Sequence, residues 1–270
     1  MTAFVYHFVF EFKTGLRNSN LLLMNYLFPL GFYVMMGLVM AQINPTFTET
    51  MIPAMVVFVA MVSTLLGLPS PLVESREAGI YRSYKINGVP ALSILSIPAL
   101  STIFHVLIVA AIISLTCAPF FDGVVPENWG NFALITLATV FAFGAIGALI
   151  GVISANSRAT VLWSQLIFLP SMLLGGLMMP LDLLPESVRF VSALLPATQA
   201  MQAYLGLAYN QTTMVNPMVS VGVLLAGGIL AFGLAIYLFN WDSRNDVRRG
   251  NPLMALLALA PYVVGAFLMG

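Results

Sequence analysis

The sequence predicts an all-α membrane protein with six transmembrane helices. Of its 270 residues, 60% are hydrophobic and only 7% are charged, whereas a soluble domain carries about 25% charged residues. Six apolar runs approach or exceed the roughly 20 residues that a helix needs to cross a bilayer, and nearly all basic residues fall between alternate runs. Around these spans we expect an interfacial helix, a cytoplasmic helix, an extracellular re-entrant hairpin and a short seventh apolar segment.

The six predicted spans follow one another within residues 20–240. None of them contains Asp, Glu, Lys or Arg, so none of them places a full charge in the hydrocarbon core of the bilayer. The predicted spans cover approximately residues 21–43, 51–72, 92–119, 132–155, 161–179 and 217–240.

The basic residues predict the orientation of these spans. With the N-terminus in the cytoplasm, nine of the ten lysines and arginines lie on the inner side, and only Arg189 lies outside. Cytoplasmic loops of membrane proteins carry an excess of Lys and Arg. The sequence therefore predicts a multi-pass protein of the cytoplasmic (inner) membrane. The nine inner residues are Lys13, Arg17, Arg76, Arg82, Lys85, Arg158, Arg244, Arg248 and Arg249.

Residues 1–19 are predicted to form an amphipathic interfacial helix. Such a helix lies in the membrane surface with its apolar face in the acyl boundary. The alternative is a frayed end of the first span, because four-residue spacing is common in short apolar helices. Apolar residues recur every four positions and two basic residues fall opposite them: Phe4, Phe8, Phe12 and Leu16 against Lys13 and Arg17.

Residues 73–88 are predicted to form one cytoplasmic helix with a charged face. Its acidic residues come early and its basic residues late, which complements a helix dipole, and Gly88 and Pro90 then end it. The alternative is a solvated face that contacts no partner. The acidic pair is Glu74 and Glu77, and the basic pair is Arg82 and Lys85.

The outer segment 180–211 is too apolar for a free loop. Pro185 and Pro196 divide it into two short helices, and Pro185 followed by Glu186 is a good helix start. Because each helix is too short to cross the bilayer, we predict a hairpin that dips into the outer leaflet and covers either the bundle or a translocation path.

Residues 241–270 combine a basic inner loop with an apolar tail. The tail, residues 253–269, carries no charge but is short and contains Pro261. It fits a short seventh span, a re-entrant segment or an interfacial tail.

Several kinds of chemistry have no motif in this chain. There is no G-x-x-x-x-G-K-[ST] phosphate loop for ATP, no His/Cys cluster for a metal, and no basic tract for nucleic acid. An ion-coupled secondary transporter or an intramembrane enzyme would need ionisable groups inside the spans. Cys117 is the single cysteine and is interpreted as a buried apolar thiol.

Polar residues within the spans are candidates for a substrate path. They are also the residues that hydrogen-bond helices to one another, and a histidine satisfied inside the bundle is the plainer interpretation of His105. The candidates are Asn25, Ser101, His105 and Gln165. The glycines Gly144, Gly147 and Gly151 indicate close helix packing, within the chain or across a dimer.

The stretch 170–200, PSMLLGGLMMPLDLLPESVRFVSALLPATQA, resembles the signature of type-2 ABC exporter permeases. In that family the fifth span ends in small residues and a proline, an apolar re-entrant segment follows, and a Leu-Pro precedes the sixth span. The cytoplasmic ESREAG, residues 74–79, resembles the charged loop after the second span, although Ile80 and Tyr81 stand where the family often has Thr-Leu. The resemblance assigns the outer gate to Gly175, Gly176, Pro180, Pro185, Leu195 and Pro196.

What the resemblance implies is a permease subunit that is not itself an enzyme. It would dimerise with a second permease subunit and dock on an ABC ATPase, which would hold ATP and Mg. Cargo would be lipophilic or amphipathic, and a polysaccharide or lipid-linked glycan is the alternative. The residues that would couple to the ATPase are Glu74, Arg76, Glu77, Gly79, Tyr81, Arg82 and Lys85.

Overall fold

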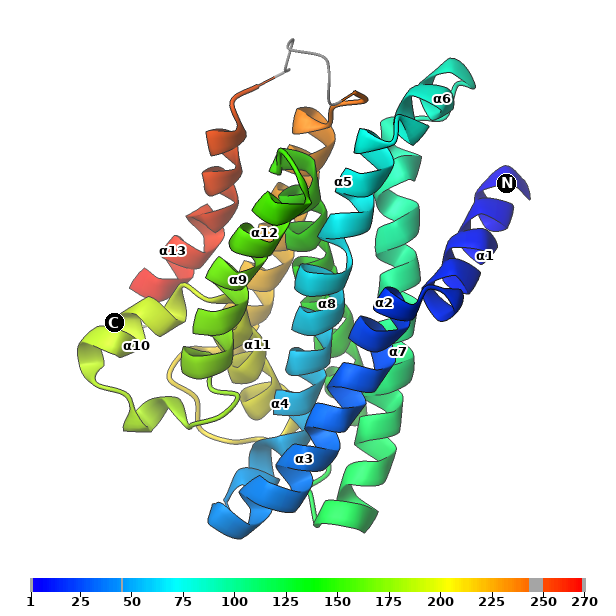
Figure 1. Cartoon of the computed structure of the whole chain (residues 1–270). Helices are drawn as coiled ribbons and strands as arrows, with labels where there is room; N and C mark the ends of the chain where they lie inside the picture. The colour runs from blue at the N-terminus through cyan, green and yellow to red at the C-terminus, as the bar shows by residue number, and fades with distance from the viewer. Residues whose placement is uncertain (1, 45, 243–249, 269–270) are drawn as a thin grey trace.

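The computed structural model describes residues 2–44, 46–242 and 250–268, and these form helices joined by short connections, with no strand among them. Figure 1 shows long helices running side by side from an end that carries α6 to an opposite end at the α3–α4 connection. We call these the α6 end and the far end. Arg244, Arg248 and Arg249, predicted in the inner basic loop, lie outside the described residues.

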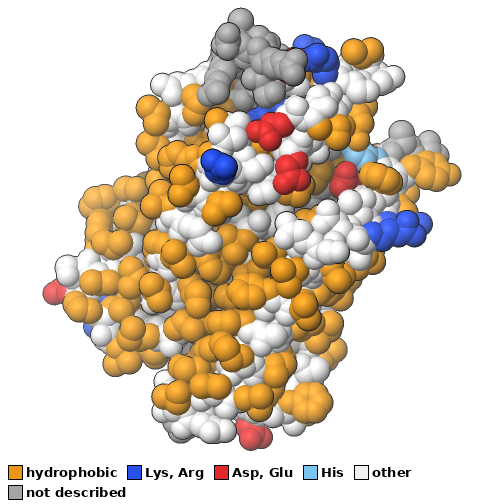
Figure 2. Space-filling model, viewed as in Figure 1, with side chains coloured by type: hydrophobic (Ala, Val, Ile, Leu, Met, Phe, Trp, Pro, Cys, Tyr) orange, Lys and Arg blue, Asp and Glu red, His pale blue; other side chains and the backbone are white. Residues whose placement is uncertain are grey.

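Five helices are long and apolar enough to cross a membrane, which confirms five of the six predicted spans. Figure 2 shows the exposed side of this arrangement, a broad hydrophobic face with charged side chains gathered mainly toward the α6 end. The first two spans are continuous stacks in which a short π-helix joins two α-helices. The five are α2–η1–α3 (Ser19–Leu22, Leu23–Leu27, Phe28–Ile43), α4–η2–α5 (Phe47–Met61, Val62–Gly67, Pro69–Glu77), α7 (Ala91–Phe121), α8 (Trp129–Ile153) and α12 (Pro217–Leu238).

The predicted fifth span corresponds to α9 (Ser157–Leu174), which is not among these five. It is 18 residues long and carries Arg158, Ser164 and Gln165, so it is less apolar than the others. Its crossing of the membrane stays a prediction.

Asparagine begins many of these helices. In each case the side-chain oxygen accepts a hydrogen bond from a backbone N–H of the first turn, which satisfies a donor that has no partner inside the helix. This local signal explains why the chain re-enters a helix directly after each polar turn. The capping residues are Asn18 for α2, Asn128 for α8, Asn156 for α9, Asn216 for α12 and Asn251 for η5.

The second span is the centre of the bundle. Nearly all of α4 is buried from Met51 to Met61, and α3, α7, α8 and α11 pack around it. Next to it, Gly147 of α8 comes so close to the second span that an added Cβ would lie 2.2 Å from the backbone oxygen of Thr64. The predicted close packing at this glycine is therefore within the chain.

The N-terminal segment forms helix α1 (Thr2–Arg17), as predicted. It packs against α7, where Phe8 contacts the ring of Phe104 at 5.3 Å and Phe12 stacks on His105 at 4.4 Å. Part of the predicted apolar face is thus covered by protein, while Phe4 and Leu16 are exposed. A position in the membrane surface stays a prediction.

The segment 180–211 contains the two short helices that the prolines predict. Pro185 precedes α10 (Glu186–Ala193) and Pro196 is the first residue of α11 (Pro196–Ala203), which continues as η4 (Tyr204–Ala208); the turn η3 (Leu181–Leu183) precedes them. Whether this hairpin enters the outer leaflet stays a prediction.

The apolar tail forms η5 (Pro252–Leu259) and α13 (Ala260–Phe267), both packed along α12. Eight residues at 2.0 Å per residue and eight at 1.5 Å give a length of about 28 Å. Phe267 reaches α10, where its ring lies 5.6 Å from that of Phe190. The tail therefore runs from the α6 end, where α12 finishes, back to the segment between α9 and α11 (Figure 1).

Candidate functional site

The charged segment after the second span is two helices, which differs from the single predicted helix 73–88. Helix α5 extends the second span to Glu77, and α6 (Ile80–Ile86) follows at a new angle. Between them Gly79 adopts φ +75°, a left-handed conformation that cannot continue a right-handed helix. Gly88 is also left-handed, at φ +72°, and ends α6 as expected.

The seven predicted coupling residues divide into an exposed set and an inward set. Arg76 and Tyr81 are buried, at 7% and 5% exposure, and Gly79 forms the break. The four exposed side chains are Glu74, Glu77, Arg82 and Lys85. Of the seven, these four alone present their side chains to the surface.

Arg76 caps the end of α8. Its guanidinium donates hydrogen bonds to the carbonyl oxygens of Val152, at 2.9 Å, and of Ser154. The last carbonyls of a helix have no partner within it, and they carry the negative end of the helix dipole, which attracts a cation. Arg76 thereby joins the end of the second span to the α8–α9 connection.

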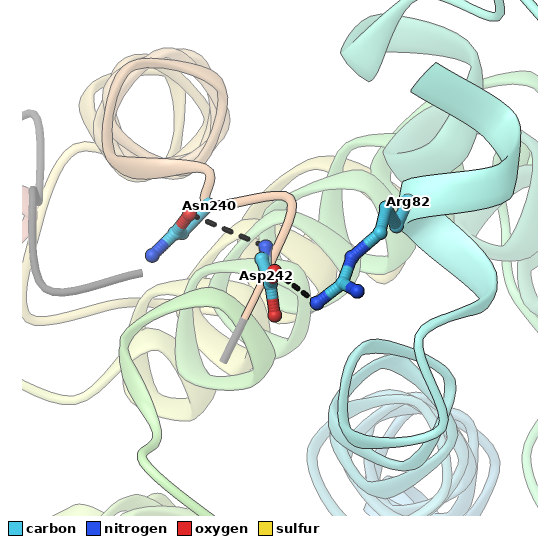
Figure 3. A network of polar contacts seen from close by, with 3 residues as sticks. All are labelled: Arg82, Asn240 and Asp242. Carbon is cyan, nitrogen blue, oxygen red and sulfur yellow. Dashed lines mark hydrogen bonds and ion pairs between the residues drawn. The ribbon is translucent and has the colours of Figure 1, made fainter. Parts of the chain in front are cut away.

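Arg82 links α6 to the residues after α12. Its Nη2 forms an ion pair with Oδ2 of Asp242, and the backbone N–H of Asp242 donates to Oδ1 of Asn240 at 3.3 Å (Figure 3). Both charged side chains are partly exposed, so the pair adds at most about 1 kcal/mol of stability. It positions α6 more than it stabilises the fold.

Helix α1 also reaches α6. The His7 ring lies edge-on to Tyr84, with centroids 5.8 Å apart, and its Nε2 is 3.5 Å from Oε1 of Glu11. Burial raises the pKa of Glu11, and the neighbouring His7 offsets part of that rise. Burial likewise raises the pKa of Tyr81, next to the same carboxyl group. The charged loop is therefore held by the N-terminal helix as well as by α8.

Three of the four predicted substrate-path residues lie on the first and third spans. Asn25 is buried within η1, and the next residue, Tyr26, places its hydroxyl 2.6 Å from Nδ1 of His105. His105 is 1% exposed and covered by Phe12 of α1. It therefore packs beneath the N-terminal helix and is not among the residues that line the cavity described next. Ser101 lies one turn earlier on the same helix, whereas Gln165 lies on α9.

A cavity of about 560 Å³ opens at the far end. The start of α4, residues 176–182, helix α11 and the loop 211–214 line it. We call it the far-end cavity. Of the predicted gate residues, Gly176 and Pro180 line it. Gly175 is not among the lining residues; an added Cβ at this position would be 2.8 Å from Cβ of Ala197. Pro185, Leu195 and Pro196 lie at the starts of the helices α10 and α11.

Sequence reasoning missed the carboxylates of this cavity, Glu49 and Asp182. The two residues are far apart in the chain, and each resembles an ordinary outer loop residue. The apolar character of segment 180–211 predicted that this segment covers another part of the protein. No sequence pattern indicated that the residues before α4 share a cavity with it.

Comparison with known protein families identifies a match for most of the chain. A family model described as "ABC-2 type transporter" matches residues 2–209. The chain belongs to the ABC-2 type transporter family. It is 25% identical over 191 residues to "Putative transport permease YvfS" of Bacillus subtilis (strain 168), covering 69% of this chain and 78% of that protein. No solved structure matches.

Membership in the ABC-2 type transporter family confirms the resemblance inferred from residues 74–79 and 170–200. Both stretches lie inside the matched residues, and so do α1, the charged loop and the far-end cavity up to η4. Helix α12 and the tail lie beyond the matched region. The chain is thus a multi-pass membrane transport protein.

Proposed function

We propose that this chain is the permease subunit of an ATP-binding-cassette exporter. It moves a lipophilic or amphipathic molecule, such as a drug, a natural product or a lipid-like compound, outward by alternating access. Membership in the ABC-2 type transporter family carries the proposal. The sequence has no phosphate loop, so ATP and Mg would bind to a separate ATPase subunit, and a second permease subunit would complete the path.

The distribution of basic side chains supports a cytoplasmic N-terminus in the inner membrane. Arg82 and Lys85 on α6 and Arg158 at the start of α9 lie at the α6 end, whereas Arg189 lies on α10. The positive-inside rule puts the α6 end in the cytoplasm. With α9 as the remaining span, six crossings return the chain to this side, and the hairpin 180–211 faces outward.

The α5–α6 corner is the proposed docking surface for the ATPase. Its exposed Glu74, Glu77, Arg82 and Lys85 offer both signs of charge over a short distance, which favours specific electrostatic contacts. Arg76 and the Arg82–Asp242 pair connect that corner to α8 and to the end of α12. A movement of the corner would therefore reach several spans at once.

A polysaccharide or lipid-linked glycan is the second candidate cargo. The observation that favours it is the set of amide and hydroxyl side chains in the far-end cavity, which suit sugar hydroxyls. They are Asn44, Thr46, Thr50, Gln202, Gln211, Thr212 and Thr213.

The test reconstitutes this chain in vesicles with and without its ATPase and follows a fluorescent amphipathic compound. We expect ATP-dependent movement only with both subunits, and loss of that movement in Glu74→Ala/Glu77→Ala. Both side chains are exposed, so thermal unfolding of the variant should match the wild type. Glu186→Ala on α10 is the matched control, because it removes an exposed carboxylate away from the corner. Transport by this chain alone along an ion gradient would overturn the proposal.

A further inference from the structure

The far-end cavity has the size of a site for a small molecule. Its volume of about 560 Å³ falls within the roughly 300–1,000 Å³ typical of ligand pockets. Four separate segments form its walls, so its shape depends on the tertiary fold and not on one flexible loop. The segments that line it lie at the opposite end of the bundle from the α5–α6 corner (Figure 1).

The charge on its walls has one sign. Glu49, in the first turn of α4, and Asp182, in the turn η3, both line the cavity. Among the described lining residues there is no lysine, arginine or histidine. The basic residue of the same segment, Arg189, donates to the backbone oxygens of Leu184 at 2.8 Å and of Asp182 at 2.6 Å. That guanidinium is therefore bound to the hairpin backbone, outside the lining.

Beside the seven amide and hydroxyl side chains named above, the lining has a soft apolar part. Four methionines, Met178, Met179, Met201 and Met214, line the cavity together with Phe47. Thioether side chains adapt to ligands of irregular shape, and an aromatic face attracts an organic cation. Phe47 is 3% exposed and begins α4 one turn before Met51, so its ring is held by the core.

These features select one class of ligand. A small inorganic cation would need a tighter set of oxygen ligands, and the described residues contain no group of three or more His, Cys, Asp or Glu that could hold a metal ion. A neutral sugar could donate hydroxyl hydrogen bonds to the two carboxylates, but it would leave their negative charge uncompensated and the thioether surface unused. A bulky organic cation uses both the negative charge and the thioether surface.

We propose that the far-end cavity binds an amphipathic organic cation, with Glu49 and Asp182 as the countercharge and the four methionines and Phe47 around its apolar groups. This inference rests on the proposed export function insofar as the bound cation is the cargo near its exit. Binding itself does not depend on the ATPase, so the two claims are separable.

The experiment measures binding of tetraphenylphosphonium to the purified full-length chain in nanodiscs, with empty nanodiscs subtracted for partition into lipid. We expect Glu49→Gln and Asp182→Asn each to weaken binding by up to about fivefold, the scale of a partly exposed charge pair, and increased salt to weaken it further. Glu186→Gln is the matched control, because this exposed outer carboxylate does not line the cavity. Thermal unfolding of all variants checks that they are folded.

Triphenylphosphine oxide, a neutral compound with similar phenyl groups, separates charge recognition from apolar binding. We expect it to bind more weakly to the wild type and to be insensitive to both substitutions. Equal affinity for the two compounds, or equal effects of Glu49→Gln and Glu186→Gln, would overturn the proposal. If tetraphenylphosphonium binds as expected but is not moved with the ATPase and ATP, the site stands and its link to export fails. If another compound is exported while the cavity binds no cation, export stands and this site fails.

Discussion

The guanidinium of Arg76 donates a hydrogen bond to the carbonyl oxygen of Val152 at 2.9 Å, across the gap between the end of the second span and the end of α8. The residue lies within a highly charged stretch of the sequence, yet it is buried. In the proposed function, Arg76 would pass a movement of the α5–α6 corner to α8 and α9, and the exposed residues around it would contact the ATPase. Substitutions at these two kinds of position should have different consequences.

Arg76→Ala should lower the stability of the folded protein. The substitution leaves two carbonyls at the end of α8 without these donors, and an unsatisfied buried acceptor costs about 1–3 kcal/mol. Thermal unfolding in detergent measures the loss. Arg158→Ala, at an exposed arginine near the start of α9, is the matched control and should change stability by less than about 0.5 kcal/mol. Equal unfolding temperatures for the two variants would contradict the capping role.

Five of the six predicted spans are long apolar helices in the structure, because a span needs a long apolar run and polar turns separate these runs in the sequence. The burial of Arg76 could not be predicted, since a helical wheel for residues 73–88 contains no information about where α8 ends. The break at Gly79 was also missed, because glycine is tolerated within helices and only the tertiary path requires φ +75° here. Likewise, no local pattern joins Glu49 to Asp182.

Gly147→Ala should destabilise the protein, while Gly144→Ala should not. At position 147 the new Cβ would lie 2.2 Å from the backbone oxygen of Thr64, whereas at position 144 the nearest atom is the Thr64 methyl group at 4.0 Å. Overpacking against backbone costs about 1–3 kcal/mol, and replacing a helical glycine with alanine otherwise gains roughly 0.5–1 kcal/mol. Unfolding in a denaturing detergent series compares the pair. Similar losses at both positions would show that close packing is not specific to Gly147.

Reversing the charges of the Arg82–Asp242 pair should show whether the pair acts by positioning α6 or by stabilising the fold. Arg82→Asp alone places two acidic groups together, so we expect reduced ATP-driven transport with a change in unfolding free energy below about 1 kcal/mol. The double variant Arg82→Asp/Asp242→Arg should recover part of the transport. The measurement is the efflux rate at matched protein levels. If Arg82 contacts only the ATPase, the double variant will be no better than the single one.

Attachment of α1 to α6 should weaken as pH rises, through the carboxyl group of Glu11. Burial raises its pKa above the ordinary value of 4.5, so the folded protein binds this proton more strongly than the unfolded chain does. The contribution of Glu11 to stability is therefore lost as pH rises from about 4.5 through the raised pKa. Nearby Tyr81 and Tyr84 remain neutral over this range, because burial raises their pKa values above the ordinary value of 10.

Hydrogen exchange of the α1 amides, corrected for the intrinsic rate at each pH, measures this effect. We expect protection in the wild type to fall as pH rises above about 4.5, and protection in Glu11→Gln to stay nearly constant and to exceed that of the wild type at alkaline pH. Glu77→Gln, at an exposed carboxyl group on α5, should follow the wild-type curve. A Glu11→Gln curve that also falls with pH would assign the dependence to another group. The contact of α1 with the α5–α6 corner would then owe nothing to this carboxyl.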